Sequence, residues 1–133
     1  MAPAARMRSV VLDCPDPRSL AEFYAGVLGG EISVEDDTWA VLTAPGGHRI
    51  AFQQAPEHTA PEWPRTDGGA QQQQLHLDFD AGSTQEALEA AEEKVLALGA
   101  RPLDLDDDGG KRAWRVYADP AGHPFCLCRI DHT

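Results

Sequence analysis

The sequence is poor in basic residues, and it has no apolar run long enough to cross a membrane. Its 11 lysines and arginines are outnumbered by 22 aspartates and glutamates, which leaves a formal net charge of −11. A surface of this sign repels phosphate backbones and anionic lipid headgroups, so we expect neither nucleic acid nor a membrane as a partner. The apolar run Val10–Leu12 near the N-terminus stops at Asp13, which is too short for a membrane span or a secretory signal.

Cysteine is also scarce. The three cysteines, Cys14, Cys126 and Cys128, are odd in number and lack the spacing of a disulfide framework. Because no signal peptide is recognisable either, this usage is typical of a reducing compartment. The sequence therefore predicts a cytoplasmic protein with free thiols.

The length of 133 residues is that of one domain and is sufficient to bury a real core. The composition, 42% hydrophobic and 25% charged, is ordinary for a globular protein. We therefore expect a single domain over residues 1–133.

The first half has the pattern of a strand, a helix and three further strands. Asp16 is a typical N-cap, Pro17 a typical first helical residue and Gly29 a typical helix end. The apolar residues between them recur on one helical face: Leu20, Phe23, Tyr24, Val27 and Leu28. Short apolar runs predict strands at 7–12, 31–34, 38–43 and 49–54.

The second half repeats this order. Ser83 and Glu86 form the S-x-x-E pattern of a capping box, and Gly99 follows the helix. The apolar face of this helix consists of Leu88, Ala91, Val95 and Leu98. The predicted strands are 75–80, 101–105, 113–118 and 125–130.

The two halves therefore predict an α+β fold of two tandem βαβββ modules. Module one covers about residues 7–54 and module two about 75–130. The stretch between them, 55–74, is rich in Pro, Gly and Gln, which predicts a linker or a lid.

Local motifs make a family resemblance specific. The segment Asp16–Gly29 resembles the D-x(6)-FY-x(3)-LG first helix of the vicinal-oxygen-chelate superfamily, which includes glyoxalases, bleomycin-resistance proteins and dioxygenases. The segment Asp119–Phe125 resembles its DP-x-G turn, and Trp63-Pro64 with Leu75–Asp78 resembles the "WP … HLD" segments of a glyoxalase-like subgroup. The resemblance covers nearly the whole chain and implies a mixed sheet curled around a cup-shaped pocket.

In active members of that superfamily, a divalent metal in the cup chelates vicinal oxygens of the substrate. Carrying the ligand positions over gives Ser9 (or Val11, if the register shifts by two), His76 and Cys126. Only His76 matches, so the usual metal triad is degenerate and we expect no metal cofactor. The alternative is a rebuilt divalent-metal site on His76 and Cys126, helped by Asp78 or Cys14.

We expect the residues that bind a ligand to lie in the cup. The candidates are His76, Trp63, Cys126, Asp78, Ser9 and Trp114. A tryptophan on a proline-stiffened loop, such as Trp63, suits flat organic ligands, although it would equally cover the open edge of a core. Trp114 and Tyr117 lie three residues apart in a predicted strand and therefore face opposite sides.

Other polar residues are weaker candidates for a role in binding or catalysis. Arg49 and Arg115 are the charged residues best placed to hold an anionic group, with solvation at the surface as the alternative. His48, His58, His123 and His132 have no partner in the sequence that would make any of them a general base.

Three functions fit this pattern. The leading hypothesis is a glyoxalase-like protein that binds a small organic molecule in the cup, whether or not it is an enzyme. The second is a metal-dependent lyase, isomerase or dioxygenase that uses a non-standard site on a vicinal-oxygen substrate. The third is a protein-interaction module with a vestigial pocket. We also expect a homodimer, because a curled sheet leaves edges and an apolar face to cover.

Overall fold

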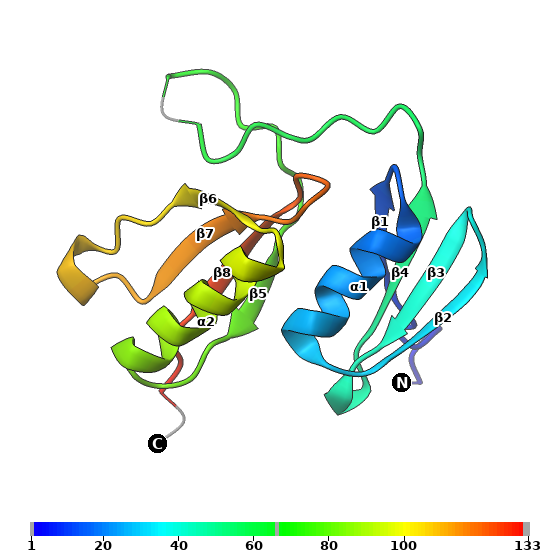
Figure 1. The fold of residues 1–133 in the computed structure, drawn as a ribbon, viewed down its shortest axis with the longest axis horizontal. Helices are drawn as coiled ribbons and strands as arrows, with labels where there is room; N and C mark the ends of the chain where they lie inside the picture. The colour runs from blue at the N-terminus through cyan, green and yellow to red at the C-terminus, as the bar shows by residue number, and fades with distance from the viewer. Residues whose placement is uncertain (1, 66, 132–133) are drawn as a thin grey trace. The chain divides into compact units, whose positions relative to one another are not determined.

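The computed structural model describes residues 2–65 and 67–131. The chain divides between His58 and Thr59 into two compact units, which we call unit one and unit two. Each unit has one α-helix and one four-stranded mixed sheet, in the chain order strand, helix, strand, strand, strand (Figure 1). The predicted α+β fold with two βαβββ modules is therefore confirmed. The described residues between the modules form no helix or strand.

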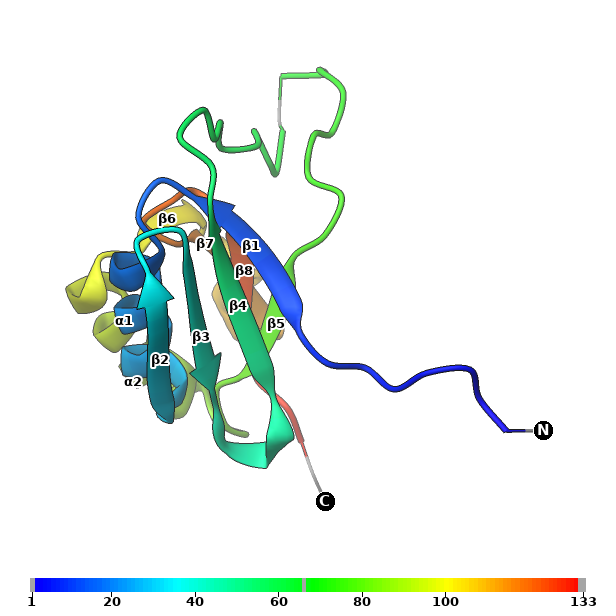
Figure 2. The ribbon, with the colours of Figure 1, turned by 90° about the vertical axis from the view of Figure 1, so that its right-hand side faces the viewer.

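Unit one has the sheet order β1-β4-β3-β2, with helix α1 on one face (Figure 2). Its elements are β1 (Val10–Cys14), α1 (Pro17–Leu28), β2 (Glu31–Asp36), β3 (Trp39–Thr43) and β4 (Arg49–Gln54). Strands β1 and β4 are parallel, and the other neighbours are antiparallel. The parallel pair is therefore formed by the first and the last strand of the module.

Helix α1 buries the face that its apolar pattern predicts. The Asp16 side chain accepts a hydrogen bond from the backbone N of Ser19 at 3.3 Å, and Pro17 occupies the first turn. Tyr24 is fully buried and stacks on Phe52 of β4, with ring centroids 5.9 Å apart. Such aromatic pairs contribute about 1 kcal/mol beyond the area they bury, so this contact helps to fix the helix on its sheet.

Unit two has the sheet order β5-β8-β7-β6, and α2 packs on it (Figure 1). Its elements are β5 (Leu77–Asp80), α2 (Gln85–Leu98), β6 (Arg101–Asp104), β7 (Trp114–Ala118) and β8 (Pro124–Cys128). Strands β5 and β8 are parallel. Among the described residues, no helix combines the length and the apolar character that a membrane span requires.

Two strands begin at least two residues later than predicted. Met7 and Leu75 are 80% and 60% exposed, and β1 and β5 start only at Val10 and Leu77. Each of these strands pairs with one neighbour only, β4 or β8. An edge strand begins only where its one neighbour runs beside it. A β-branched or apolar run in the sequence does not show where that pairing starts.

The start of α2 also differs from the prediction. The N-cap is Thr84, whose hydroxyl accepts a hydrogen bond from the backbone N of Ala87 at 3.0 Å. The predicted capping box of Ser83 and Glu86 is therefore wrong by one residue. Serine and threonine hydroxyls serve equally as caps, so the choice depends on where the chain leaves the turn after β5.

Arg115 joins α2 to the sheet of unit two. Its guanidinium lies 2.7 Å from a carboxylate oxygen of Asp107 and 3.0 Å from one of Glu92, and its side chain is 12% exposed. The buried Tyr117 hydroxyl donates to the same Glu92 carboxylate at 2.8 Å. Arg115 is thus neither solvated nor free for an external anion, because carboxylates of its own chain surround it.

Candidate functional site

Unit two contains an open pocket of about 410 Å³. Small-molecule sites in proteins commonly measure roughly 300–1,000 Å³, so the pocket is large enough for a small organic molecule. Its walls come from the segment before β5, from β5 itself and from β7 and β8. The lining residues are Trp63, His76, Asp78, Ala113, Trp114, Cys126, Cys128, Arg129 and Ile130.

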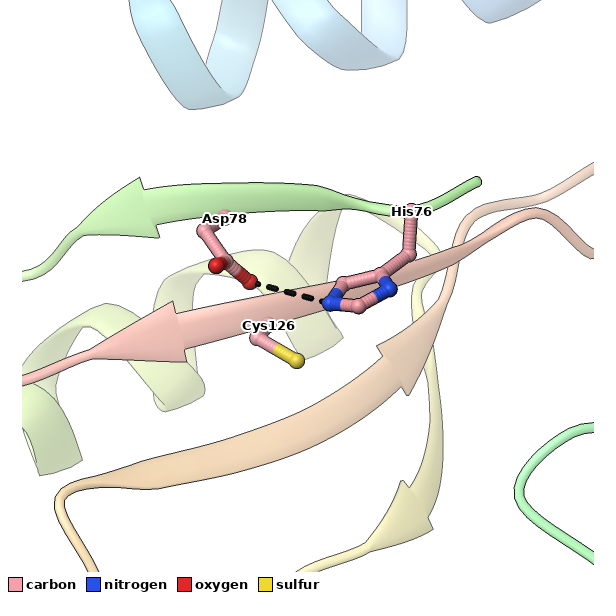
Figure 3. Close-up of side chains that lie close together, drawn as sticks. All are labelled: His76, Asp78 and Cys126. Atoms are coloured by element: carbon pink, nitrogen blue, oxygen red, sulfur yellow. Dashed lines mark ion pairs between the residues drawn. The ribbon is translucent and has the colours of Figure 1, made fainter. Parts of the chain in front are cut away.

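Three side chains of the lining, His76, Asp78 and Cys126, lie close together (Figure 3). Asp78 of β5 lies directly opposite Cys126 of β8 in the parallel register, and His76 stands one residue before β5 begins. Strand alternation places His76 and Asp78 on one side, and the imidazole Nε2 is 3.3 Å from Asp78 Oδ1. One ligand atom from each of the three residues lies within 4.8 Å of the other two. The cluster therefore has the donor types and the compactness of a metal site.

The His76 ring is held on two further sides. Its Nδ1 lies 3.1 Å from the amide oxygen of Gln73, a residue of the segment before β5. The Trp63 ring stacks on the imidazole, with centroids 4.9 Å apart and planes at 22°. The orientation of His76 is thus set by Gln73 and Trp63, and its Nε2 is directed at Asp78.

The two thiols of the pocket stay protonated at neutral pH. Burial, followed by the charge of Asp78, raises the pKa of the Cys126 thiol to about 12. The same two causes raise the pKa of Cys128 to about 11. The described residues contain no disulfide. A thiol in this state is a poor nucleophile at neutral pH, because the thiolate is the reactive form.

We predict that both thiols of the metal-free, folded protein react slowly with iodoacetamide at pH 8. Each pKa unit changes the thiolate fraction about tenfold, so Cys128 should react about 100-fold more slowly than an ordinary thiol and Cys126 more slowly still. Mass spectrometry of quenched samples measures the rates, with the urea-unfolded chain as the control. Equal rates in the folded and unfolded protein would contradict the burial of these groups.

The remaining predicted site residues are divided between the units. Trp114 lines the pocket and is 46% exposed, whereas Tyr117 is fully buried, which confirms that the two face opposite sides of β7. Ser9 and Cys14 belong to unit one and are not part of the pocket of unit two. Cys14 is buried beside the backbone oxygen of Gln53, with its Sγ 3.8 Å away.

Four lining residues were not among the predicted ligand-binding residues: Ala113, Cys128, Arg129 and Ile130. Strand β8 ends at Cys128, two residues before its predicted end, and both Arg129 and Ile130 then line the pocket. Alternation along a longer strand would have placed only Ile130 on this side. Arg129 follows the end of β8, and its guanidinium donates to the Gly110 backbone oxygen at 2.8 Å.

His123 has a partner that the sequence did not reveal. Its Nδ1 lies 2.8 Å from Asp119, a fully buried carboxylate that also accepts backbone hydrogen bonds from Ala121 and His123. These contacts close the turn between β7 and β8, so the pair stabilises the turn. His132 lies outside the described residues.

Comparison with known proteins identifies the fold. The sequence model of the family described as "Glyoxalase-like domain" matches residues 9–128. A possible glyoxalase from Bacillus cereus has a similar structure, with 15% identity and a TM-score of 0.67 over 94% of this chain and 99% of that chain. None of the curated proteins matches the chain in sequence.

Two further solved structures are similar. One is an enzyme of the glyoxalase/bleomycin resistance protein/dioxygenase family from Burkholderia phytofirmans. It has 18% identity and a TM-score of 0.64 over 92% of this chain and 97% of that chain. The other is a mutant of the fosfomycin resistance protein FosX from Listeria monocytogenes, complexed with Mn(II) and a dihydroxypropylphosphonic acid. It has 15% identity and a TM-score of 0.65 over 97% of this chain and 95% of that chain. At these identities the likeness concerns the fold.

Proposed function

Because the chain belongs to the glyoxalase-like domain family of the vicinal-oxygen-chelate superfamily, we propose that it binds a small organic molecule in the pocket of unit two. The observation that carries this proposal is the stack of Trp63 on His76 at the wall of a pocket of about 410 Å³. An aromatic surface beside a few polar groups is the usual composition of a small-molecule site.

The lining favours a flat ligand with a polar end. Trp63 and Trp114 supply aromatic surface, and Arg112 already lies over the Trp114 ring at 5.3 Å from its centroid. The charged and imidazole side chains that line the pocket are His76, Asp78 and Arg129. The net charge of −11 attracts cationic ligands and repels anionic ones, and it leaves neutral ligands unaffected.

We predict that the Trp63→Ala variant loses affinity for a flat aromatic probe. With the cationic dye thioflavin T, the dissociation constant should rise about tenfold, because one aromatic stack contributes about 1 kcal/mol or slightly more. Fluorescence titration of the metal-free protein measures the constant.

The matched control is Trp39→Phe, which changes a tryptophan of β3 in unit one. This variant should bind the dye as the unsubstituted protein does. Equal dissociation constants for Trp63→Ala and the unsubstituted protein would place the dye elsewhere and remove the support for this pocket.

Metal-dependent catalysis on an oxygen-bearing substrate is the second candidate function. The convergence of His76, Asp78 and Cys126 is the observation that favours it. Manganese, the ion in the FosX complex, is best served by oxygen and imidazole ligands. A set that includes a buried thiol does not fit that ion, so we derive no reaction step through manganese.

A further inference from the structure

Arg129 differs from the other half-buried arginines of unit two in the partners of its charge. The other three each form an ion pair: Arg65 with Asp67, Arg112 with Asp104, and Arg115 with Asp107. Among the described residues, the guanidinium of Arg129 instead contacts two neutral oxygens. A charge that is partly removed from water without a counter-charge costs free energy. An anion that enters the pocket would therefore gain a cation that no carboxylate of the described chain neutralises.

Neutral groups fix the position of this guanidinium. Its Nη2 donates to the Gly110 backbone oxygen at 2.8 Å, and its Nη1 donates to the side-chain oxygen of Gln85. The Gln85 amide nitrogen donates to Asp107 at 2.8 Å, which leaves the amide oxygen for Arg129. Within the described residues these contacts use two of the five guanidinium N–H donors, so three remain for a ligand.

Arg129 also adjoins the aromatic surface of the pocket. Its backbone N donates to the oxygen of Ala113 at 2.7 Å, and the next residue, Trp114, is paired with Cys128 in the register of β7 and β8. Arg129 and Trp114 both line the pocket, and Trp114 is 46% exposed. A fixed cation beside an exposed ring suits an aromatic ligand that carries a negatively charged substituent.

We propose that Arg129 binds the carboxylate of a flat aromatic acid in the pocket of unit two. A planar carboxylate matches the fork of N–H donors on a guanidinium. One negative charge suits this pocket better than the two of a phosphate monoester, because Asp78 also lines it and the chain carries a net charge of −11. The repulsion by distant charges is screened beyond about 8 Å at physiological ionic strength, whereas direct contact with Arg129 is not. This inference rests on the proposed function and names the ligand class for the same pocket.

Binding of cinnamate and of its neutral amide, cinnamamide, tests the proposal. The two probes share the same flat skeleton and differ in charge. Isothermal titration calorimetry on the metal-free full chain at physiological salt measures both dissociation constants. We expect cinnamate to bind about tenfold more tightly than cinnamamide, which is the usual effect of a hydrogen-bonded contact with a charged group.

Two variants locate the carboxylate. Arg129→Gln should weaken cinnamate binding about tenfold and leave cinnamamide binding unchanged, so the preference for the acid is lost. Lys111→Gln is the matched control, because Lys111 is exposed, does not line the pocket and changes the net charge by the same amount when it is replaced. This variant should keep the preference. Circular dichroism checks that both variants are folded.

A pH series on the unsubstituted protein tests the proposal without any variant. The preference for cinnamate should stay constant from about pH 6 to pH 9, because a guanidinium keeps its charge over this range whereas an imidazole loses it. Besides His76, the titratable lining consists of Asp78 and two thiols, whose pKa values burial raises to about 12 for Cys126 and about 11 for Cys128. A preference that falls as the pH rises would assign the carboxylate to His76 and overturn the role of Arg129.

Three further outcomes would also overturn the proposal. They are equal binding of the two probes by the unsubstituted protein, a preference that survives in folded Arg129→Gln, and a preference that is lost in Lys111→Gln. The proposed function is tested separately, because its probe is a cationic dye and its variant is Trp63→Ala. Dye binding that depends on Trp63, together with no preference for cinnamate, leaves the small-molecule pocket standing and removes only the anionic ligand.

Discussion

The Gly30→Ala variant is expected to lose more than about 3 kcal/mol of unfolding free energy, a large part of the stability of a small domain. Gly30 precedes β2 with φ at +104°, a conformation that residues with a side chain rarely adopt. A Cβ there would overlap the backbone oxygen of Thr43 at the end of β3 and would lie 2.9 Å from Cα of Ala44. Backbone atoms cannot rotate away as a side chain can, so the sheet must distort.

Urea denaturation measures the loss, and Gly47→Ala is the matched control. Gly47 has φ at +80°, and among the described residues nothing lies within 4 Å of an added Cβ. Its alanine variant should therefore lose only about 1 kcal/mol, the usual cost of this backbone conformation. If both variants lose the same free energy, the close approach of Gly30 to β3 is not what requires glycine there.

Arg115→Ala is expected to destabilise unit two by about 3 kcal/mol. The substitution leaves the carboxylates of Asp107 and Glu92 close together without their shared cation. Removing one partner of a partly buried ion pair commonly lowers the unfolding free energy by more than the pair itself contributes, because the remaining charges stay desolvated. The unfolding free energy from urea denaturation at neutral pH gives the size of the effect.

Arg112→Ala serves as the control for Arg115. Among the described residues, the ion-pair partner of Arg112 is Asp104 at 3.0 Å, and that carboxylate is 35% exposed. A partly exposed pair contributes roughly 0–1 kcal/mol, so this loss should be at most about one third of that for Arg115→Ala. Equal losses would mean that the carboxylates around Arg115 are solvated once the arginine is removed.

The helices were the elements best predicted from the sequence. Asp16, Pro17 and Gly29 set the limits of α1 through contacts within a few residues of each other, and the structure has the helix between them. The strand limits were less accurate, because Val10 and Leu77 begin strands only where β4 and β8 supply partners. Pairing of this kind joins residues that are far apart in the chain, so local patterns do not contain it.

The candidate site was partly visible in the sequence. Alternation places His76 and Asp78 on one side, and the family resemblance singles out Cys126. The roles of Gln73 and Trp63 were not predictable from alternation, because they belong to a segment without regular structure and their contacts with His76 are set by its path.

Local sequence patterns were sufficient to predict the two βαβββ modules and both helices. They also predicted that a histidine, an aspartate and two thiols lie on shared strand faces. The three-dimensional structure was needed to show that Asp78 lies opposite Cys126, that Trp63 stacks on His76 and that Asp107 neutralises Arg115. The two kinds of feature differ in sequence separation, because helix caps and side-chain alternation act over a few residues. Parallel pairing instead joins residues far apart in the chain, such as Val10 with Ile50 and Asp78 with Cys126, and its register depends on how the whole sheet packs.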